Sequence, residues 1–244
     1  MARAWFRFYA ELNDFLPPAR RAAAFEHEFA APATVKDRIE ALGVPHTEVD
    51  LILANSEAVD FDYRVGDGDR ISVYPVFEAF DIAPVSRLRA RPLREPRFVL
   101  DTHLGRLAAY LRMLGFDAAW RNHCDDAELA RIAHDEHRIL LTRDTGLLKR
   151  KAVTHGYFVR ETNARRQMEE VVSRFHLAGR AAPFTRCLRC NEPLETAARE
   201  EVLENLPPRI AQLHDEFRRC PACRRVYWKG THYERMRRLV DSLS

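Results

Sequence analysis

Two Cys-x-x-Cys pairs constrain the folding of this 244-residue chain more than any other feature of its sequence. The pairs are Cys187/Cys190 and Cys220/Cys223, with 29 residues between them. Four thiolates in two such pairs are the ligand set of a tetrahedral structural Zn²⁺ site. Without a secretion signal, paired cysteines indicate metal more often than disulfides. The pattern predicts a zinc ribbon over residues 181–244, with no coordination position left open for catalysis.

The 29-residue gap contains "REEVLENLPPRIAQLHDEF", which predicts short helices around its two prolines. Aromatic and cationic side chains then alternate in "RRVYWKGTHYERMRR". Such side chains can stack on bases and neutralise phosphates, so Tyr227 and Trp228 are candidate nucleic-acid contacts. Alternatively, both aromatics pack the small core of the ribbon. The sequence favours neither interpretation over the other.

Strand and helix patterns alternate over residues 97–180. Short apolar runs predict strands at 97–100, 117–120, 139–142 and 157–160. Leucines at helical spacing follow the first strand, and further helices are expected around residues 129–133, 147–151 and 168–175. This order predicts an α/β fold with a mainly parallel sheet and helices on both faces.

Asp101 directly follows the apolar run Phe98-Val99-Leu100, and Asp144 comes two residues after Leu140-Leu141-Thr142. Ligands of an open parallel sheet sit outside the carboxyl ends of its strands. Neighbouring carboxylates repel one another unless a cation lies between them, and oxygen ligands suit Mg²⁺ or Mn²⁺. We therefore predict Asp101 and Asp144 as ligands of a catalytic Mg²⁺ or Mn²⁺ ion. The alternatives are an ordinary turn residue for Asp101 and a helix cap for Asp144.

A third acidic ligand is expected from the segment "CDDAEL", which opens the second helix. Asp126 is the preferred candidate, and Asp125 is close behind. Asp125 also fits a purely structural role, because Glu128 three residues later completes an acidic capping pattern at a helix start.

The charge of the chain is unevenly distributed. Residues 1–80 carry 8 Lys/Arg against 14 Asp/Glu, whereas residues 81–185 carry 19 against 13. A basic part of this kind suggests a polyanionic partner, although solvated helix faces would give the same balance. The candidate phosphate contacts near the acidic residues are Arg143, Arg106, Arg112 and Lys149. Their contribution to binding would depend on salt and not on base sequence.

Residues 1–80 predict a small α+β domain, beginning with an alternating strand over residues 3–10 and a helix capped by Thr34. The segments "VKDRIEALGVP" and "LILANSEAVDFDYRVGDGDRISVYP" resemble the β-grasp fold of the ubiquitin-like sulfur carriers. The C-terminal Gly-Gly of those carriers is missing, because the chain continues as "VFEAFDIAPVS". We interpret this acidic domain as a binding or regulatory appendage with a possible protein partner. Residues 81–96, with three prolines and several arginines, predict a linker.

The segments "FVLDTHLGRLAAYLRMLGFDAAW", "DDAELARIA" and "RILLTRDTGLLKR" resemble the Mut-seven C-terminal RNase family. That family is a PIN-like nuclease group with a zinc ribbon, and some members carry an N-terminal β-grasp domain. The resemblance implies a ribonuclease with Asp101, Asp126 and Asp144 as its acidic positions. The candidates for a fourth position are Glu161 and Asn163, of which Glu161 is an acid. The expected activity is metal-dependent hydrolysis of RNA. The alternative is a non-catalytic RNA-binding or adaptor protein.

No apolar run approaches the roughly 20 residues that a membrane-spanning helix needs. The first ten residues also lack the pattern of a signal peptide. We therefore expect a cytoplasmic protein with no membrane partner.

Overall fold

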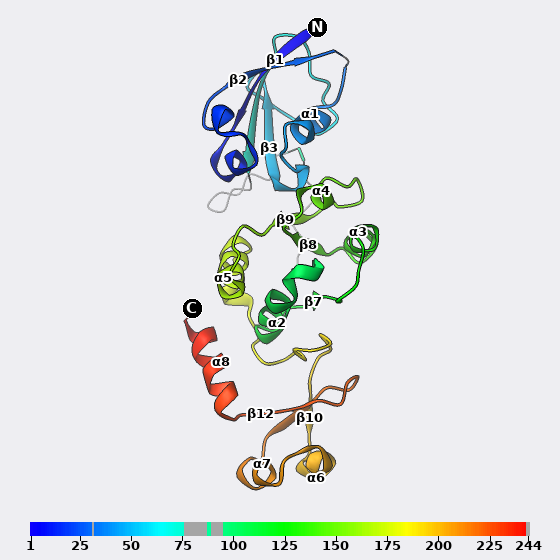
Figure 1. The fold of residues 1–244 in the computed structure, drawn as a ribbon, viewed down its shortest axis with the longest axis vertical. Helices are drawn as coiled ribbons and strands as arrows, with labels where there is room; N and C mark the ends of the chain where they lie inside the picture. Colours follow the sequence, from blue (N-terminus) through cyan, green and yellow to red (C-terminus); the bar gives the residue numbers. More distant parts are fainter. Residues whose placement is uncertain (31, 76–86, 89–94, 243–244) are drawn as a thin grey trace. The chain divides into compact units, whose positions relative to one another are not determined.

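The computed structural model, drawn as a ribbon in Figure 1, describes residues 1–30, 32–75, 87–88 and 95–242. The chain divides into two compact units. Unit 1 comprises Met1–Glu95 and Ala133–Phe158, and unit 2 comprises Pro96–Ile132 and Val159–Ser244. The linker expected at residues 81–96 falls largely outside the described residues. The predicted domain boundaries therefore remain a prediction.

Unit 1 contains a five-stranded sheet of order β2-β1-β5-β3-β4. Its strands are β1 (Ala2–Phe8), β2 (Phe25–Phe29), β3 (Val49–Ala54), β4 (Glu57–Val59) and β5 (Arg70–Pro75). Strand β1 pairs in parallel with β5 and antiparallel with β2. With helix α1 (Val35–Ala41), this is the β-grasp arrangement that the sequence predicts.

The alternating pattern of β1 buries Ala4, Phe6 and Phe8 in the core of this sheet. The prediction that the strand continues to Ala10 is wrong. Ala10 has a positive φ of 46° and begins a 3-10 helix. The Asn13 amide donates to the carbonyls of Phe8 and Ala10, which ends the strand at Phe8.

Helix α1 starts where the sequence predicts. The Thr34 hydroxyl accepts from the Asp37 backbone N–H, and the Asp37 carboxylate accepts from the Thr34 backbone N–H. This capping box satisfies two N–H groups that the first helical turn would leave unpaired. Val35 and Ile39 are buried on the face toward the sheet.

The second segment of unit 1 contains β8 (Ile139–Thr142), α4 (Thr145–Leu148) and β9 (Gly156–Phe158). The helix expected at 147–151 begins earlier, at Thr145, because the Asp144 carboxylate caps it by accepting from the Gly146 N–H, and it ends at Leu148. The strand expected at 157–160 is also shifted. It ends at Phe158 because the backbone of the next residues makes other hydrogen bonds. The Arg160 and Glu161 N–H groups donate to the Glu170 carboxylate.

Hydrogen bonds join this segment to the β-grasp part of unit 1, and three of those between described residues lie near the 3-10 helix His46–Glu48. The pairs are the Phe158 N–H with Glu48 Oε1 at 2.6 Å, His46 Nε2 with the Val153 carbonyl at 2.8 Å, and Lys149 Nζ with the Glu40 carbonyl at 2.9 Å. The side chains of His46 and Glu48 are buried, so water cannot easily replace the two bonds that these side chains form.

Unit 2 begins with β6 (Phe98–Leu100), α2 (Gly105–Met113) and β7 (Ala118–Ala119). Strand β7 is shorter than the predicted 117–120. Helices α3 (Asp126–Asp135) and α5 (Ala164–Arg174) follow later in the chain. Strands β6 and β7 of unit 2 pair in parallel, and strands β8 and β9 of unit 1 also pair in parallel; the strand order is β7-β6-β8-β9. The predicted α/β class, a parallel sheet flanked by helices, is confirmed.

The C-terminal part of unit 2 contains the antiparallel sheet β10-β11-β12. Its strands are Glu195–Ala197, Phe217–Arg219 and Val226–Trp228. The short helices α6 (Arg199–Val202) and α7 (Pro208–Leu213) fill the gap between the cysteine pairs, as the sequence predicts, and α8 (Thr231–Asp241) follows. The small core of this region consists of Ala197, Val202, Leu206 and Phe217.

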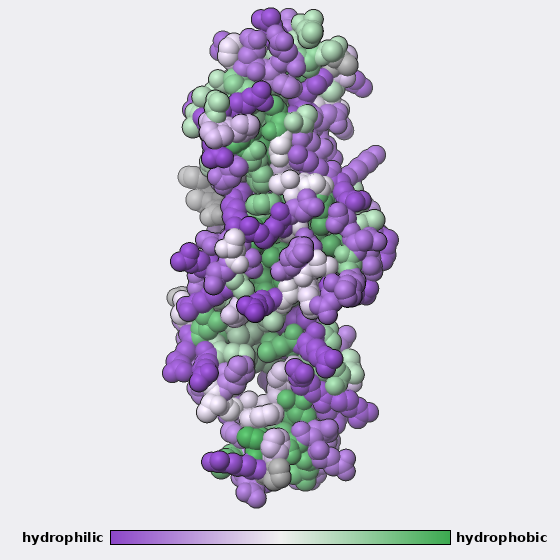
Figure 2. Space-filling view, in the orientation of Figure 1, coloured by the Kyte–Doolittle hydropathy of each residue, from purple (hydrophilic) through white to green (hydrophobic). Residues whose placement is uncertain are grey.

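Hydrophilic side chains cover most of the face drawn in Figure 2, and apolar ones show between them in limited areas. Among the described residues, no helix has both the length and the apolar character needed to cross a membrane.

Candidate functional site

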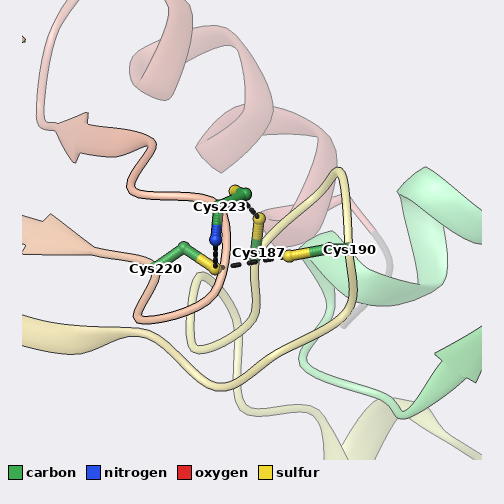
Figure 3. A group of neighbouring side chains, drawn as sticks. All are labelled: Cys187, Cys190, Cys220 and Cys223. Atoms are coloured by element: carbon green, nitrogen blue, oxygen red, sulfur yellow. Dashed lines mark hydrogen bonds between the residues drawn. The ribbon is translucent and has the colours of Figure 1, made fainter.

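The four cysteines of the two Cys-x-x-Cys pairs converge, and their side chains point toward one another (Figure 3). Their sulfur atoms all lie within 4.8 Å of one another, with 3.6 Å between Cys187 and Cys223 and 3.3 Å between Cys190 and Cys220. A disulfide would bring two sulfurs to about 2.05 Å. A tetrahedral zinc with bonds of about 2.3 Å places them about 3.8 Å apart. The four cysteines could therefore bind a metal such as zinc.

Both pairs sit in turns with the same backbone hydrogen bonds. The Cys187 carbonyl accepts from the Asn191 N–H, and the Cys220 carbonyl accepts from the Arg224 N–H. Asn191 and Arg224 each adopt a positive φ, 72° and 61°, which turns the chain back after the second cysteine. This local geometry presents both sulfurs of a pair on one side of the turn.

The Tyr227 hydroxyl lies beside this cluster. It accepts from the Leu188 N–H at 3.1 Å and lies 3.2 Å from Cys187 Sγ, so its hydrogen is available to the sulfur. Burial alone would raise the pKa of Cys187, but the hydrogen bonds from Tyr227 and from backbone N–H groups outweigh it and lower the pKa to about 6. The thiolate is the metal-binding form of cysteine, so Tyr227 favours that form at Cys187, whereas burial raises the pKa of Cys190 and of Cys220.

Arg112 connects α2 to the first cysteine pair. Its guanidinium donates to the carbonyls of Ala118, Leu188 and Arg189 at 2.8–3.1 Å, and the residue is only 3% exposed. Burial lowers the pKa of Arg112, which the nearby cysteines and Asp117 partly oppose. The prediction that Arg112 contacts phosphate is wrong, because its side chain is buried and its guanidinium donates to protein carbonyls.

The candidate catalytic acids occupy the ends of elements. Asp101 follows β6 and accepts from the Thr102 hydroxyl at 3.1 Å. Asp125 caps α3, since its carboxylate accepts from the Glu128 N–H at 2.8 Å, and Asp126 is the first residue of that helix. Asp144 caps α4 through the Gly146 N–H at 2.6 Å. Asp101 and Asp126 belong to unit 2 and Asp144 to unit 1, so a shared metal ion stays a prediction.

An open pocket of about 480 Å³ lies in unit 2, close to Asp101 in the chain. It is lined by residues that follow β6, by the residue that follows β7 and by the start of α5. The lining residues are His103, Gly105, Arg106, Trp120, Thr162, Asn163, Ala164 and Gln167. Arg106 is the one predicted substrate contact among them.

A family model described as the Mut7-C RNAse domain matches residues 96–240, more than half of the chain. The chain belongs to the Mut7-C RNAse domain family. A second model, described as Mut7-C ubiquitin, matches residues 1–81. The family resemblance noted in the sequence is thereby confirmed for both parts. Searches of the curated proteins and of the solved structures find no match to this chain.

Within the Mut7-C RNAse domain, the other predicted substrate contacts differ in their surroundings. Arg143 is exposed beside Asp144. Lys149 is half-buried, and its ammonium donates to the Glu40 carbonyl. Trp228 packs against the small core beside the cysteines, as one of the two interpretations of the sequence expects. A role for Arg143, Lys149 or Trp228 in substrate binding stays a prediction.

Sequence reasoning missed Trp120, although a signal for it exists. Trp120 follows β7 just as Asp101 follows β6, and its indole N–H donates to the Thr102 carbonyl at 3.1 Å. The rule that selects the carboxyl ends of parallel strands therefore also points to Trp120.

Cys124, the unpaired fifth cysteine, is half-buried. Burial and a hydrogen bond with Glu128 raise its pKa to about 11, so its thiol is protonated at neutral pH.

Proposed function

We propose that this protein is a divalent-metal-dependent ribonuclease that hydrolyses RNA phosphodiester bonds. The observation that carries the proposal is the match of residues 96–240 to an RNase domain family. The acids that follow β6 and β8 support it, because they stand at the carboxyl ends of strands in a parallel sheet, where ligands bind.

Asp101 and Asp144 would hold the divalent ion, and Asp126 would complete its ligand set or orient the attacking water. Carboxylate oxygens are the ligands that Mg²⁺ and Mn²⁺ prefer. When bound, such an ion supplies a water of lowered pKa and neutralises charge on the phosphate. Asp126 is the preferred third ligand, and Asp125, whose carboxylate accepts from the Glu128 N–H, is the alternative. Arg143, exposed next to Asp144, is a candidate phosphate contact.

The test is cleavage of a mixed single-stranded RNA with added Mn²⁺, using wild type and two variants, Asp101→Asn and Asp144→Asn. Replacing one carboxylate by an amide keeps the size and a hydrogen-bond acceptor but removes the charge that holds a cation. We expect both variants to lose at least about a hundredfold in rate, an order of magnitude typical of losing one strong transition-state interaction. Full activity in both variants would contradict the proposed site.

The second candidate is a non-catalytic RNA-binding or adaptor protein. One observation favours it: Asp125 and Asp144 already have structural roles as helix caps. Under this function the wild-type protein would bind RNA in a salt-dependent way and cleave none with Mg²⁺ or Mn²⁺. The acidic ubiquitin-like part, residues 1–81, is the candidate surface for a protein partner.

We also propose that the four cysteines hold a structural Zn²⁺ ion. Four sulfur ligands leave no open coordination position, so this ion would stabilise the fold and would not bind substrate. The convergence of all four sulfurs within 4.8 Å of one another supports this assignment.

A further inference from the structure

The open pocket in unit 2 has the chemistry of a nucleotide site. We propose that it binds one nucleotide of a single-stranded RNA, with the phosphate near Arg106 and the base against Trp120. The inference rests on the proposed function only in its substrate class, which is RNA. Its evidence is the lining of the pocket, which does not include any of the proposed metal ligands.

The pocket favours an anion. Arg106 and His103 line it and are exposed, and within the described part of the chain neither forms an ion pair or a side-chain hydrogen bond. No Asp or Glu occurs among the described lining residues. A guanidinium without a carboxylate partner is available to a phosphate, which it can bind through two parallel hydrogen bonds.

Trp120 provides a fixed aromatic surface at this pocket. Its indole N–H donates to the Thr102 carbonyl, and its ring packs against Gly105 at the start of α2. A Cβ atom at Gly105 would lie 2.5 Å from the ring, so only glycine leaves room for the indole in this place. A half-buried indole that is fixed by these contacts with Thr102 and Gly105 is suited to stack on a base of any identity.

Polar groups surround the space between Arg106 and Trp120. The Asn163 carboxamide oxygen accepts from the N–H groups of Arg165 and Arg166, which orients its amide nitrogen as a remaining donor. Gln167 is buried, and its amide nitrogen donates to the Glu161 carbonyl. These fixed amides can contact sugar and base edges without selecting one base.

The proposal is tested by calorimetric titration of the full-length protein, in buffer without added Mg²⁺ or Mn²⁺. The titrants are adenosine 5′-monophosphate, adenosine and inorganic phosphate. If base and phosphate both contact the pocket, the monophosphate binds more tightly than either part. Equal affinities for the monophosphate and for phosphate would remove the stacking role of Trp120, and no binding of the monophosphate would overturn the proposal.

Two variants assign the contacts. Arg106→Gln should weaken monophosphate binding about tenfold or more and leave adenosine binding unchanged, because a charge-assisted contact to phosphate is lost. Trp120→Leu should weaken the binding of adenosine 5′-monophosphate and of adenosine about fivefold or more, as expected for the loss of one stacked base. Trp120→Phe, which keeps a ring, should lie between wild type and Trp120→Leu. Arg237→Gln on α8 and Trp5→Leu on β1 are the matched controls, and thermal melting checks that each variant folds.

The outcome is separable from that of the nuclease proposal. Binding that responds to Arg106 and Trp120 in a protein that cleaves no RNA would sustain the pocket and reject catalysis. RNA cleavage with the same KM in wild type, Arg106→Gln and Trp120→Leu would sustain catalysis and reject the pocket. Binding that weakens equally in the two control variants would also reject it.

Discussion

At the scale of single residues, Asp144 has two roles, a structural one and a proposed catalytic one, which two different substitutions can separate. Its carboxylate caps α4 through the Gly146 N–H, and it is also a proposed metal ligand. Asparagine caps helices about as well as aspartate, whereas alanine does not. The two substitutions therefore change different properties of the protein.

We predict that Asp144→Asn abolishes Mn²⁺-dependent cleavage and changes the free energy of unfolding by less than about 0.5 kcal/mol. Asp144→Ala should lose the activity and also about 1 kcal/mol of stability, since the cap is lost. Urea denaturation followed by circular dichroism measures the stability, and an RNA cleavage assay measures the activity. Equal stability losses in the two variants would show that the cap contributes little.

Arg112 is the second residue whose role is open to a direct test. We predict that Arg112→Ala destabilises unit 2 by at least about 2 kcal/mol, because the carbonyls of Ala118, Leu188 and Arg189 lose their donor. Lysine should not rescue it, since a single ammonium cannot reproduce the planar fork of donors.

The readouts for Arg112 are thermal melting and the rate of metal loss to a chelator. The matched control is the exposed Arg106, six residues earlier on α2, where Arg106→Ala should leave both readouts unchanged. A melting curve of Arg112→Ala that coincides with wild type would contradict the structural role.

At the scale of elements, the junction of β9 with the 3-10 helix His46–Glu48 is the point where distant parts of unit 1 meet. Glu48 is 1% exposed and accepts from the Phe158 N–H at 2.6 Å. A buried N–H without an acceptor costs about 1–3 kcal/mol. The stability of the strand that follows α4 therefore depends on a residue of the β-grasp part.

We predict that Glu48→Ala lowers the free energy of unfolding of unit 1 by about 1–3 kcal/mol, and that Glu48→Gln, which keeps an acceptor oxygen, loses less. Hydrogen exchange should report the same order, with the Phe158 amide exchanging fastest in Glu48→Ala. As a control, the exposed Glu57 on β4 is expected to tolerate the change to alanine. Unchanged protection of Phe158 in Glu48→Ala would contradict this account.

At the scale of the whole molecule, the chain combines two kinds of stabilisation. Unit 1 has a core of aromatic and aliphatic side chains from five strands and a helix. Among the described residues, the core of the small sheet β10-β11-β12 contains four buried apolar residues. Small cores of this kind usually need a metal or disulfides. The stability of the two regions should therefore respond differently to metal removal.

We predict that the purified protein contains one equivalent of zinc, and that Cys220→Ser reduces this amount and exposes residues near 186–228 to limited proteolysis. The β-grasp part should resist the protease equally in both proteins, because its core does not involve metal. Elemental analysis measures the zinc. The matched control is Cys124→Ser, which lies outside the cluster and should retain full zinc. A wild-type protein without zinc would reject the structural metal.

Sequence alone determined the features that depend on spacing along a few residues. The cysteine pairs, the Thr34 cap, the buried alternation of β1 and the apolar strands before Asp101 and Asp144 are all local patterns. Hydrogen bonds and side-chain periodicity act over two to four residues, so the residue types specify them directly. The family resemblance added the RNase assignment, which no single local pattern carries.

Only the tertiary structure decided which distant groups meet. Arg112 reaches carbonyls 76 and 77 residues away, Lys149 reaches the Glu40 carbonyl 109 residues away, and Glu48 reaches the Phe158 N–H 110 residues away. An exposed phosphate-binding cation and a buried structural one look alike in sequence, because their difference lies in burial and in the acceptors nearby. The periodicity of the sequence does not report burial or nearby acceptors. The packing of the folded chain therefore decides whether a cation is structural or available to a phosphate.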